Sequence, residues 1–260
     1  MLSFIRRQRR DPRTPKGRRA YAVGDIHGRL DLLERLLADI ELDIESRPPA
    51  ETYVVFLGDL VDRGPHSKEV VELLRTLESK AFKPVFLIGN HEEVLLRLLG
   101  GERGLLKSWL RFGGAECLQS YGVGPKQIGQ LPEQAALDVI RSSIPAGHVA
   151  FLKSFIDTFR FGDYLFVHAG IRPGVELAGQ SQRDLRWIRA AFLDDPSDHG
   201  FVVVHGHTIC DQVDERANRI GIDTGAYATG VLTAVGLEDD QRWYLSTCAK
   251  QSEQTASLVD

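Results

Sequence analysis

Two hydrophobic patterns alternate over the first 100 residues of the chain. Continuous apolar runs within residues 18–25, 52–59 and 83–90 predict three buried strands. After each run, apolar residues recur at helical spacing, in segments 30–44, 67–79 and 92–100. Strands and helices that alternate in this way predict a parallel sheet with right-handed crossovers. This half of the chain is therefore expected to be α/β.

The pattern changes in the second half. Residues from about 101 to 161 contain helical pieces around a Gly- and Pro-rich middle, which predicts a mostly helical cap insertion over the sheet edge. Further strands are predicted at 163–170, 201–208, 218–225, 230–237 and 242–248, with a helix at 181–195. The last four strands have short connections, and we expect them to pair antiparallel.

Both ends of the chain differ from the part between them. Residues 6–19 hold eight Lys or Arg and one acid, Asp11, so residues 1–18 are expected to form a disordered basic arm. The alternative is a weak electrostatic contact between this arm and an anionic surface, such as lipid, nucleic acid or an acidic partner. Residues 248–260 are expected to form a polar tail. We therefore expect one domain over residues 19–247, which includes the insertion.

Composition changes this picture little. The chain is 43% hydrophobic and 26% charged, with a net charge of −4, which gives no indication of specific nucleic-acid binding. Its three scattered cysteines argue against a disulfide framework and favour a reducing, cytoplasmic location. No run of 18 apolar residues predicts a transmembrane helix, and the basic arm lacks the apolar core of a secretory signal.

Polar residues of a distinctive kind follow five of the predicted strands. Ligands of open α/β sheets collect at the carboxyl ends of the strands, where these side chains would converge. The glycines that precede several of them would let the chain turn sharply off each strand. The residues are Asp25 and His27, then Asp59, Asp62 and Arg63, then Asn90 and His91, then His168, and finally His205 and His207.

The residue types indicate a metal site. Asp, Asn and His without Cys form an oxygen and nitrogen site that suits Mn²⁺, Fe or Zn²⁺. The ligands are too numerous for one catalytic ion, so we expect two divalent ions, with Asp59 as the bridging carboxylate. Arg63 is expected to bind phosphate, and Asp62 to orient His91 as an acid that protonates the leaving group. His205 alternates with His207 along one strand and is expected to lie in the core.

The motifs GDIHG, GDLVDRG, GNHE, HAG and GHT…IDTG, in this order, resemble the phosphoprotein phosphatase family of the calcineurin-like metallophosphoesterases. They resemble most its bacterial and bacteriophage branch of serine/threonine protein phosphatases. The resemblance implies an αββα sandwich of two mixed sheets flanked by helices. It also implies that one ion is held by Asp25, His27 and Asp59, and the other by Asp59, Asn90, His168 and His207.

The residues alone leave Arg186 and Arg189 equal as candidates for a second phosphate-binding arginine. The same branch carries a Trp-x-Arg element, which Trp187-Ile188-Arg189 resembles, so the resemblance favours Arg189. The implied reaction is direct hydrolysis of a phosphomonoester by a hydroxide that bridges two metal ions, most simply Mn²⁺. The implied substrates are phosphoserine and phosphothreonine in proteins, with phosphotyrosine or a small phosphoester as further options.

Two other functions stay open. Dinucleoside polyphosphate hydrolases of the same superfamily that split diadenosine tetraphosphate symmetrically tend to read GDLVARG and GNHD. This chain has Asp62 and Glu92 at the differing positions, which favours the phosphatase. A catalytically inactive phosphate-binding scaffold is the other alternative, and the intact set of ligand positions argues against it.

Overall fold

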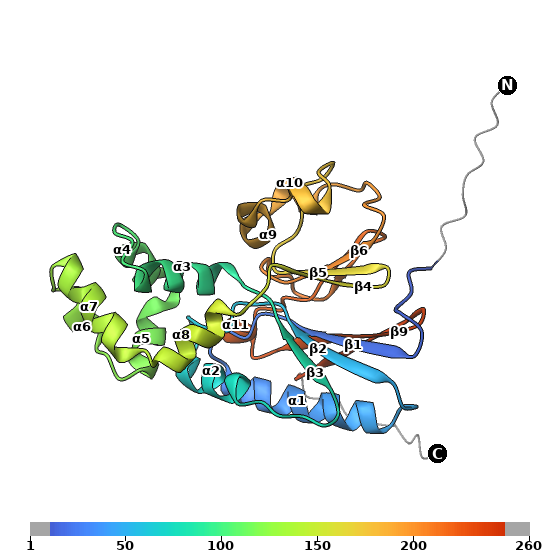
Figure 1. The fold of residues 1–260 in the computed structure, drawn as a ribbon, viewed down its shortest axis with the longest axis horizontal. Coiled ribbons are helices and arrows are strands. Elements are labelled where there is room, and N and C mark those ends of the chain that lie inside the picture. The colour runs from blue at the N-terminus through green and yellow to red at the C-terminus, as the bar shows by residue number, and fades with distance from the viewer. Residues whose placement is uncertain (1–10, 248–260) are drawn as a thin grey trace, which may run out of the picture.

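A computed structural model describes residues 11–247 and arranges them as two stacked mixed sheets with helices on the outside (Figure 1). In the first sheet, the three predicted N-terminal strands pair in parallel, and two C-terminal strands pair antiparallel beside them. The order across this sheet is β10 (Gln241–Ser246), β9 (Thr233–Glu238), β1 (Arg18–Val23), β2 (Glu51–Phe56) and β3 (Lys83–Phe86).

The second sheet differs in part from the expectation. The order across this sheet is β4 (Thr158–Phe161), β5 (Tyr164–Val167), β6 (Val202–His205), β8 (Arg219–Gly221) and β7 (Asp214–Glu215). Strands β5, β6 and β8 run parallel, so the prediction of antiparallel pairing holds for β9 with β10 and was wrong for β6 with β8. A loop that carries β7 brings the chain back before β8 begins, and neither β4 nor β7 was predicted.

Alternation along the strands divides the core into layers. On β1, Ala20 and Ala22 belong to the cluster between the two sheets, which also contains Phe166 of β5. Tyr21 and Val23 point the other way, into the cluster beneath the helices. The resulting α-β-β-α arrangement is the predicted fold class.

Helices α1 (Leu30–Glu45), α2 (Ser67–Arg75) and α3 (Asn90–Leu99) follow β1, β2 and β3 as expected. The single helix predicted over residues 181–195 is instead two, α9 (Gln182–Trp187) and α10 (Ala190–Leu193). The chain between them is extended at Ile188, with φ −62° and ψ 144°, so the helix stops there. Phe192 of α10 packs on the outer face of the second sheet. The remaining short helices are η2 (Leu177–Gly179) and α11 (Ala226–Thr229), and Ala226 of α11 belongs to the cluster beneath the helices of the first sheet.

The cap is helical, but it ends earlier than predicted. Its last helix stops at Lys153, and β4 begins at Thr158 inside the expected range. It packs against α2 and α3, and Phe151 of its last helix also contacts Phe86 of the edge strand β3, with ring centroids 4.9 Å apart. We refer to residues 106–153 as the helical insertion. It contains α4 (Leu106–Trp109), η1 (Leu110–Gly114), α5 (Ala115–Ser120), α6 (Pro125–Ile128), α7 (Glu133–Ser143) and α8 (Ala146–Lys153).

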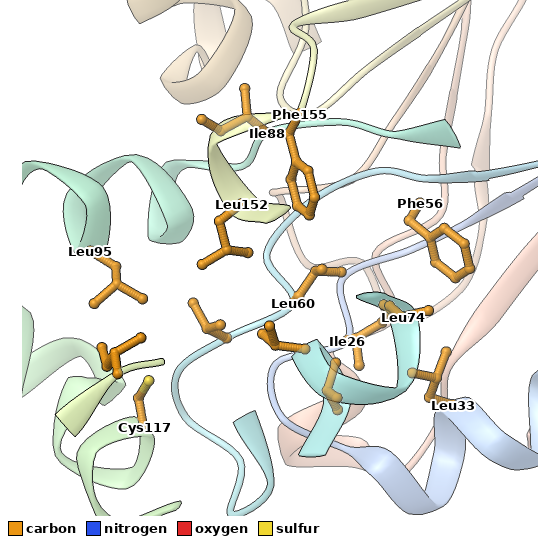
Figure 2. Close-up of a cluster of buried hydrophobic side chains, with 14 of the residues drawn as sticks. Ile26, Leu33, Phe56, Leu60, Leu74, Ile88, Leu95, Cys117, Leu152 and Phe155 are labelled. Atoms are coloured by element: carbon orange, nitrogen blue, oxygen red, sulfur yellow. The ribbon is translucent and has the colours of Figure 1, made fainter. Parts of the chain in front are cut away.

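One hydrophobic cluster joins the helical insertion to the first sheet. Figure 2 shows Cys117 and Leu152 of the insertion in the same cluster as Leu60, which follows β2, and Leu95 of α3. All four side chains are fully buried. The insertion therefore shares its core with the strands that carry the candidate site.

Residues 11–18 are ordered, contrary to the expectation for this part of the basic arm. The Arg13 backbone N–H donates to Asp163 at 2.9 Å, and the Arg13 guanidinium pairs with Asp240 at 2.5 Å. Thr14 is buried and bonded to Asp239. The segment thus ties the β4–β5 turn to the β9–β10 turn. Residues 1–10 and the expected tail at 248–260 lie outside the described part. No helix within residues 11–247 is both long and apolar enough to cross a membrane.

Candidate metal centre

The loops that follow β1, β2, β5 and β6 meet the first turn of α3 at one end of the stacked sheets. Each contributes predicted ligands, and all of these side chains are at least nine-tenths buried. The predicted ligands are Asp25 and His27 after β1, Asp59 after β2, Asn90 at the start of α3, His168 after β5 and His207 after β6.

Asp59 lies at the centre of this cluster. Its Oδ2 is 3.6 Å from Nε2 of His27 and 3.5 Å from Nε2 of His168. Two groups of three residues have ligand atoms close enough to hold a cation, His27–Asp59–His91 and Asp59–His168–His207. Both groups contain Asp59, which is the arrangement that a bridging carboxylate requires.

The histidine rings are oriented with a free nitrogen toward the cluster. Nδ1 of His27 bonds to the Val61 carbonyl and Nδ1 of His168 to the Leu57 carbonyl, each at 2.8 Å. These bonds place the proton on Nδ1 and leave Nε2 as a lone-pair donor. Asn90 Oδ1 then lies 3.0 Å from Nε2 of His168, so two acceptors face each other. A cation between these two atoms would make the contact favourable.

His207 gives a second indication that cations belong here. Its buried Nε2 has no hydrogen-bond partner within residues 11–247. Burial lowers the pKa of His207 to about 2 and that of His27 to about 3, so both rings are neutral. A buried neutral imidazole with an unused lone pair is the form that binds divalent metal. The residues present therefore fit divalent cations.

Asp25 lies beside the two groups but belongs to neither of them. Its carboxylate accepts the backbone N–H of His207, with distances of 3.2 and 3.1 Å to its two oxygens. Burial, together with the nearby charges of Asp223 and Asp59, raises the pKa of Asp25 well above its usual range. Three carboxylates this close repel one another, and nearby cations would relieve that repulsion. Asp223 was not identified from the sequence as part of this cluster, although it belongs to the IDTG motif.

The predicted pair of Asp62 and His91 is formed. Nδ1 of His91 lies 2.7 Å from Oδ2 of Asp62, which is completely buried. Burial lowers the pKa of His91, but the carboxylates of Asp59 and Asp62 outweigh it and raise that pKa to about 9. The indole N–H of Trp109 also donates to Asp62, at 3.0 and 3.2 Å from its two oxygens. The sequence analysis did not identify this contact of Trp109.

Arg63 lies at the rim of the cluster. Its Nη2 is 3.3 Å from Nε2 of His91, and its guanidinium stacks over the ring of Tyr227 at 4.6 Å. The Arg63 backbone N–H donates to the carbonyl of Gly113 in the helical insertion, at 3.0 Å. No ion pair involves Arg63 within residues 11–247, so its charge is available to an anion. Neither Tyr227 nor Gly113 had a sequence signal that linked it to Arg63.

The two candidate arginines after α9 occupy different environments. Arg186 is buried and pairs with Asp157 at 2.7 Å and Glu93 at 3.3 Å. Arg189 is exposed beside the cluster, where it bonds to the His207 carbonyl and the Thr208 hydroxyl. The break between α9 and α10 places it there. His205 is buried in the second sheet against Phe192, outside both metal-binding groups.

Backbone strain concentrates at the same residues. His27, Asp59, Asp62, Arg63 and His207 all have positive φ, between 47° and 72°. This region is unfavourable for residues with a Cβ, and such strain gathers at functional sites. The glycines were expected to provide this freedom. Gly58 does so, with φ 100°, whereas Gly89 is extended and is required for space, because a Cβ there would lie 2.1 Å from Oδ1 of Asp59.

Glu92 holds the loop that carries Asp59. Its buried carboxylate accepts backbone N–H groups from Asp59 and Leu60, both at 2.8 Å, and from Gly89 at 3.0 Å. The sequence comparison treated Glu92 as a marker of substrate. The structure shows that it clamps two loops together instead.

Comparison with known proteins agrees with this geometry. A family model described as calcineurin-like phosphoesterase matches residues 18–226. A bis(5'-nucleosyl)-tetraphosphatase PrpE (asymmetrical) from Halalkalibacterium halodurans is 28% identical over 230 residues, covering 82% of this chain and 87% of the relative. Serine/threonine-protein phosphatase 2 of Salmonella typhimurium is 25% identical over 228 residues, covering 83% and 91%.

Solved structures share the fold. A candidate diadenosine tetraphosphatase superimposes with a TM-score of 0.60 at 22% identity, covering 88% of this chain and 93% of the other. A cold-active protein tyrosine phosphatase gives 0.51 at 19% identity, covering 91% and 81%. Together with the match over residues 18–226, the clustered His and Asp side chains lead to one conclusion. The chain belongs to the calcineurin-like phosphoesterases, and its clustered side chains are placed to hold metal ions.

Proposed function

We propose that this protein is a phosphatase that uses two divalent metal ions to hydrolyse phosphomonoesters, with phosphorylated proteins as its substrates. The observation that carries the proposal is the position of the Asp62–His91 pair beside the cluster, with Arg63 3.3 Å from His91. The proton donor His91 and the guanidinium of Arg63, which forms no ion pair within residues 11–247, therefore lie beside the predicted metal ligands.

Each residue has a role in this proposal. Asp25, His27 and Asp59 would hold one ion, and Asp59, Asn90, His168 and His207 the other. Such ions, which we expect to be Mn²⁺, supply an activated water and neutralise phosphoryl charge. Arg63 and Arg189 bind the phosphate oxygens. His91, kept protonated and oriented by Asp62, gives its proton to the leaving oxygen.

The residues that favoured a protein phosphatase act indirectly. Asp62 and Glu92 are both completely buried, so neither is placed to touch a substrate. Asp62 matters through His91, because an acid is needed most when the leaving group is an unactivated alcohol, as in phosphoserine. A pyrophosphate leaving group is more acidic and needs less help. The pair therefore favours phosphomonoesters on chemical grounds.

The second candidate is hydrolysis of dinucleoside polyphosphates. Relatives with tetraphosphatase names support it, including the protein from Halalkalibacterium halodurans. A cleft next to the site, about 740 Å³ in volume, also supports it, because four arginines outnumber the two acids that line it. Arg97 and Arg172 pair with the acids, Glu93 and Asp184, and the other two arginines are Arg183 and Arg189. Extended polyphosphates suit such a surface.

One panel of substrates separates the two functions. Turnover with Mn²⁺ is measured on phosphoserine, phosphothreonine and phosphotyrosine peptides, on p-nitrophenyl phosphate and on diadenosine tetraphosphate. We expect the highest kcat/KM on a phosphomonoester. A higher value on diadenosine tetraphosphate would favour the second function, and no turnover of any of them would contradict both and support an inactive scaffold.

A further inference from the structure

A second cleft opens between the metal centre and the helical insertion. It has a volume of about 400 Å³, which is within the range of small-molecule sites. Arg63, Asn90 and His91 line the end nearest the cluster. Phe112 and Trp187 also line it, and they are among the few large apolar side chains that are substantially exposed in the described structure.

Phe112 is held in an exposed position by the backbone of the insertion. Its side chain is 59% exposed, and it lies at a kink in η1 where the next residue, Gly113, has φ 113°. The carbonyl of Gly113 accepts the backbone N–H of Arg63 at 3.0 Å. The ring of Phe112 is thereby positioned relative to one of the proposed phosphate-binding arginines.

Trp187 has the same relation to the other arginine. It is 39% exposed at the end of α9, and its indole N–H donates to Glu93 of α3 at 3.2 Å. Arg189 follows it by two residues, across the extended residue Ile188. Phe112 is thus linked to Arg63 through the backbone of Gly113, and Trp187 is linked to Arg189 through Ile188. The four side chains of Phe112, Trp187, Arg63 and Arg189 line a single cleft.

Exposed aromatic side chains in a concave surface next to catalytic groups indicate a binding site for an apolar or planar group. The position in the cleft decides which group. Arg63 and His91 line the same cleft as the two aromatic side chains, so a ring that occupies it can be joined directly to a phosphoryl group bound at Arg63. A nucleobase lies farther away, beyond a ribose and, in a dinucleoside polyphosphate, beyond further phosphates.

We propose that Phe112 and Trp187 bind the aromatic ring of the leaving group, so that the preferred substrates are phosphate monoesters of phenols, such as phosphotyrosyl side chains. This inference rests on the proposed phosphatase function and shifts its substrate class from phosphoserine to aryl esters. Water attacks phosphorus, the bond between phosphorus and the ring oxygen breaks, and His91 protonates that oxygen, so phenol and inorganic phosphate leave.

The test compares two inhibitors that differ only in the ring, phenylphosphonate and methylphosphonate. Inhibition constants are measured on the full chain with Mn²⁺, with p-nitrophenyl phosphate as substrate. We expect the wild type to bind phenylphosphonate more tightly. Phe112→Ala and Trp187→Ala are each expected to reduce this preference about two- to tenfold, with little effect on methylphosphonate. Leu42→Ala, at a 63% exposed position on α1, is the control and should change neither constant.

Phe112→Tyr, which keeps a ring, is expected to retain the preference and shows that loss in Phe112→Ala is not misfolding. Equal inhibition of the wild type by both phosphonates would overturn the inference, as would a preference that survives in both alanine variants. If adenosine 5'-monophosphate inhibited the two alanine variants less than the wild type, while phenylphosphonate inhibited them equally, Phe112 and Trp187 would bind a nucleobase instead. That result would also overturn the inference. A wild type that hydrolyses no phosphoester at all would instead contradict the proposed function.

Discussion

Asp59 is the residue on which the metal centre depends most. Its Oδ2 lies within 4 Å of the Nε2 atoms of three histidines, and it is the residue that both metal-binding groups share. Burial opposes its ionisation, but the surrounding histidines hold the pKa of Asp59 below its usual range. Asp59 is therefore ionised at neutral pH, which is the form that a bridging carboxylate requires.

We expect Asp59→Asn to lose both metal and activity, because a neutral amide cannot bridge two cations. Metal content of the purified variant and its turnover of p-nitrophenyl phosphate check this. Asp138→Asn, at an exposed position on α7, is the control and should match the wild type. Full activity in Asp59→Asn would exclude the bridging role.

His91 makes a prediction about leaving groups. His91→Asn removes the proposed acid and is expected to lower kcat about 10²- to 10⁴-fold on phosphoserine peptides. On p-nitrophenyl phosphate the loss should be much smaller, because nitrophenolate leaves without a proton. Parallel kinetics on the two substrates test the difference. Equal losses on both would show that His91 does not act as an acid.

Glu92 belongs with these residues although it touches no substrate. Glu92→Gln replaces one acceptor oxygen with an NH₂ group that faces backbone N–H donors. We expect the free energy of unfolding to fall by about 1–3 kcal/mol. Urea denaturation measures this, with Glu69→Gln, half-exposed on α2, as a control that should change little. An unchanged stability would mean that the clamp contributes nothing.

At the scale of elements, the kinked η1 helix builds part of the site from the insertion. Trp109 bonds to Asp62, and the Gly113 carbonyl bonds to Arg63. The end of α4 and the kink in η1 thus contact the Asp62 side chain and the Arg63 backbone from outside the sheets.

Gly113→Ala tests this contact. A Cβ at Gly113 would lie 2.5 Å from the Arg63 nitrogen, so the two loops must separate. We expect weaker inhibition by inorganic phosphate and lower kcat/KM. Gly104→Ala is the matched control, because Gly104 also has positive φ, 83°, but has open space around it. It should cost about 1 kcal/mol of backbone strain and leave phosphate inhibition unchanged. Equal effects of both substitutions on inhibition would contradict the contact.

Local pattern predicted the elements whose partners are near in sequence. The β1–β2–β3 sheet follows from alternating apolar strands and amphipathic helices, and the residues at the strand ends meet as expected. The direction of β8 depends on how the chain returns after β6, which hydrophobic periodicity does not encode. The break at Ile188 and the contacts of Trp109 and Tyr227 arise from tertiary packing between distant segments, for which one sequence holds no local signal.

At the scale of the whole molecule, metal should stabilise the fold. The four loops and the first turn of α3 bring together buried carboxylates and the His207 ring, whose Nε2 has no hydrogen-bond partner within residues 11–247. A ligand that binds only the folded state adds about 2.7 kcal/mol at a hundredfold excess over its Kd. Chelation is therefore expected to lower Tm, and Mn²⁺ to restore it, when both are followed by thermal denaturation. Asp59→Asn should not respond. If neither chelation nor Mn²⁺ changed the Tm of the wild type, no ion would bind at this site.

The common core of the insertion and the first sheet limits how such an enzyme can be re-engineered. Cys117 and Leu152 pack in one cluster with Leu60 and Leu95, so the helical insertion cannot be exchanged independently of the first sheet (Figure 2). In a chimera that carries the helical insertion of a relative, the buried side chains of the insertion would not match the volumes of the side chains beneath the loop of Asp62. To exchange substrate preference between homologues, the buried residues between the insertion and the first sheet must therefore be replaced together with the exposed residues that line the cleft.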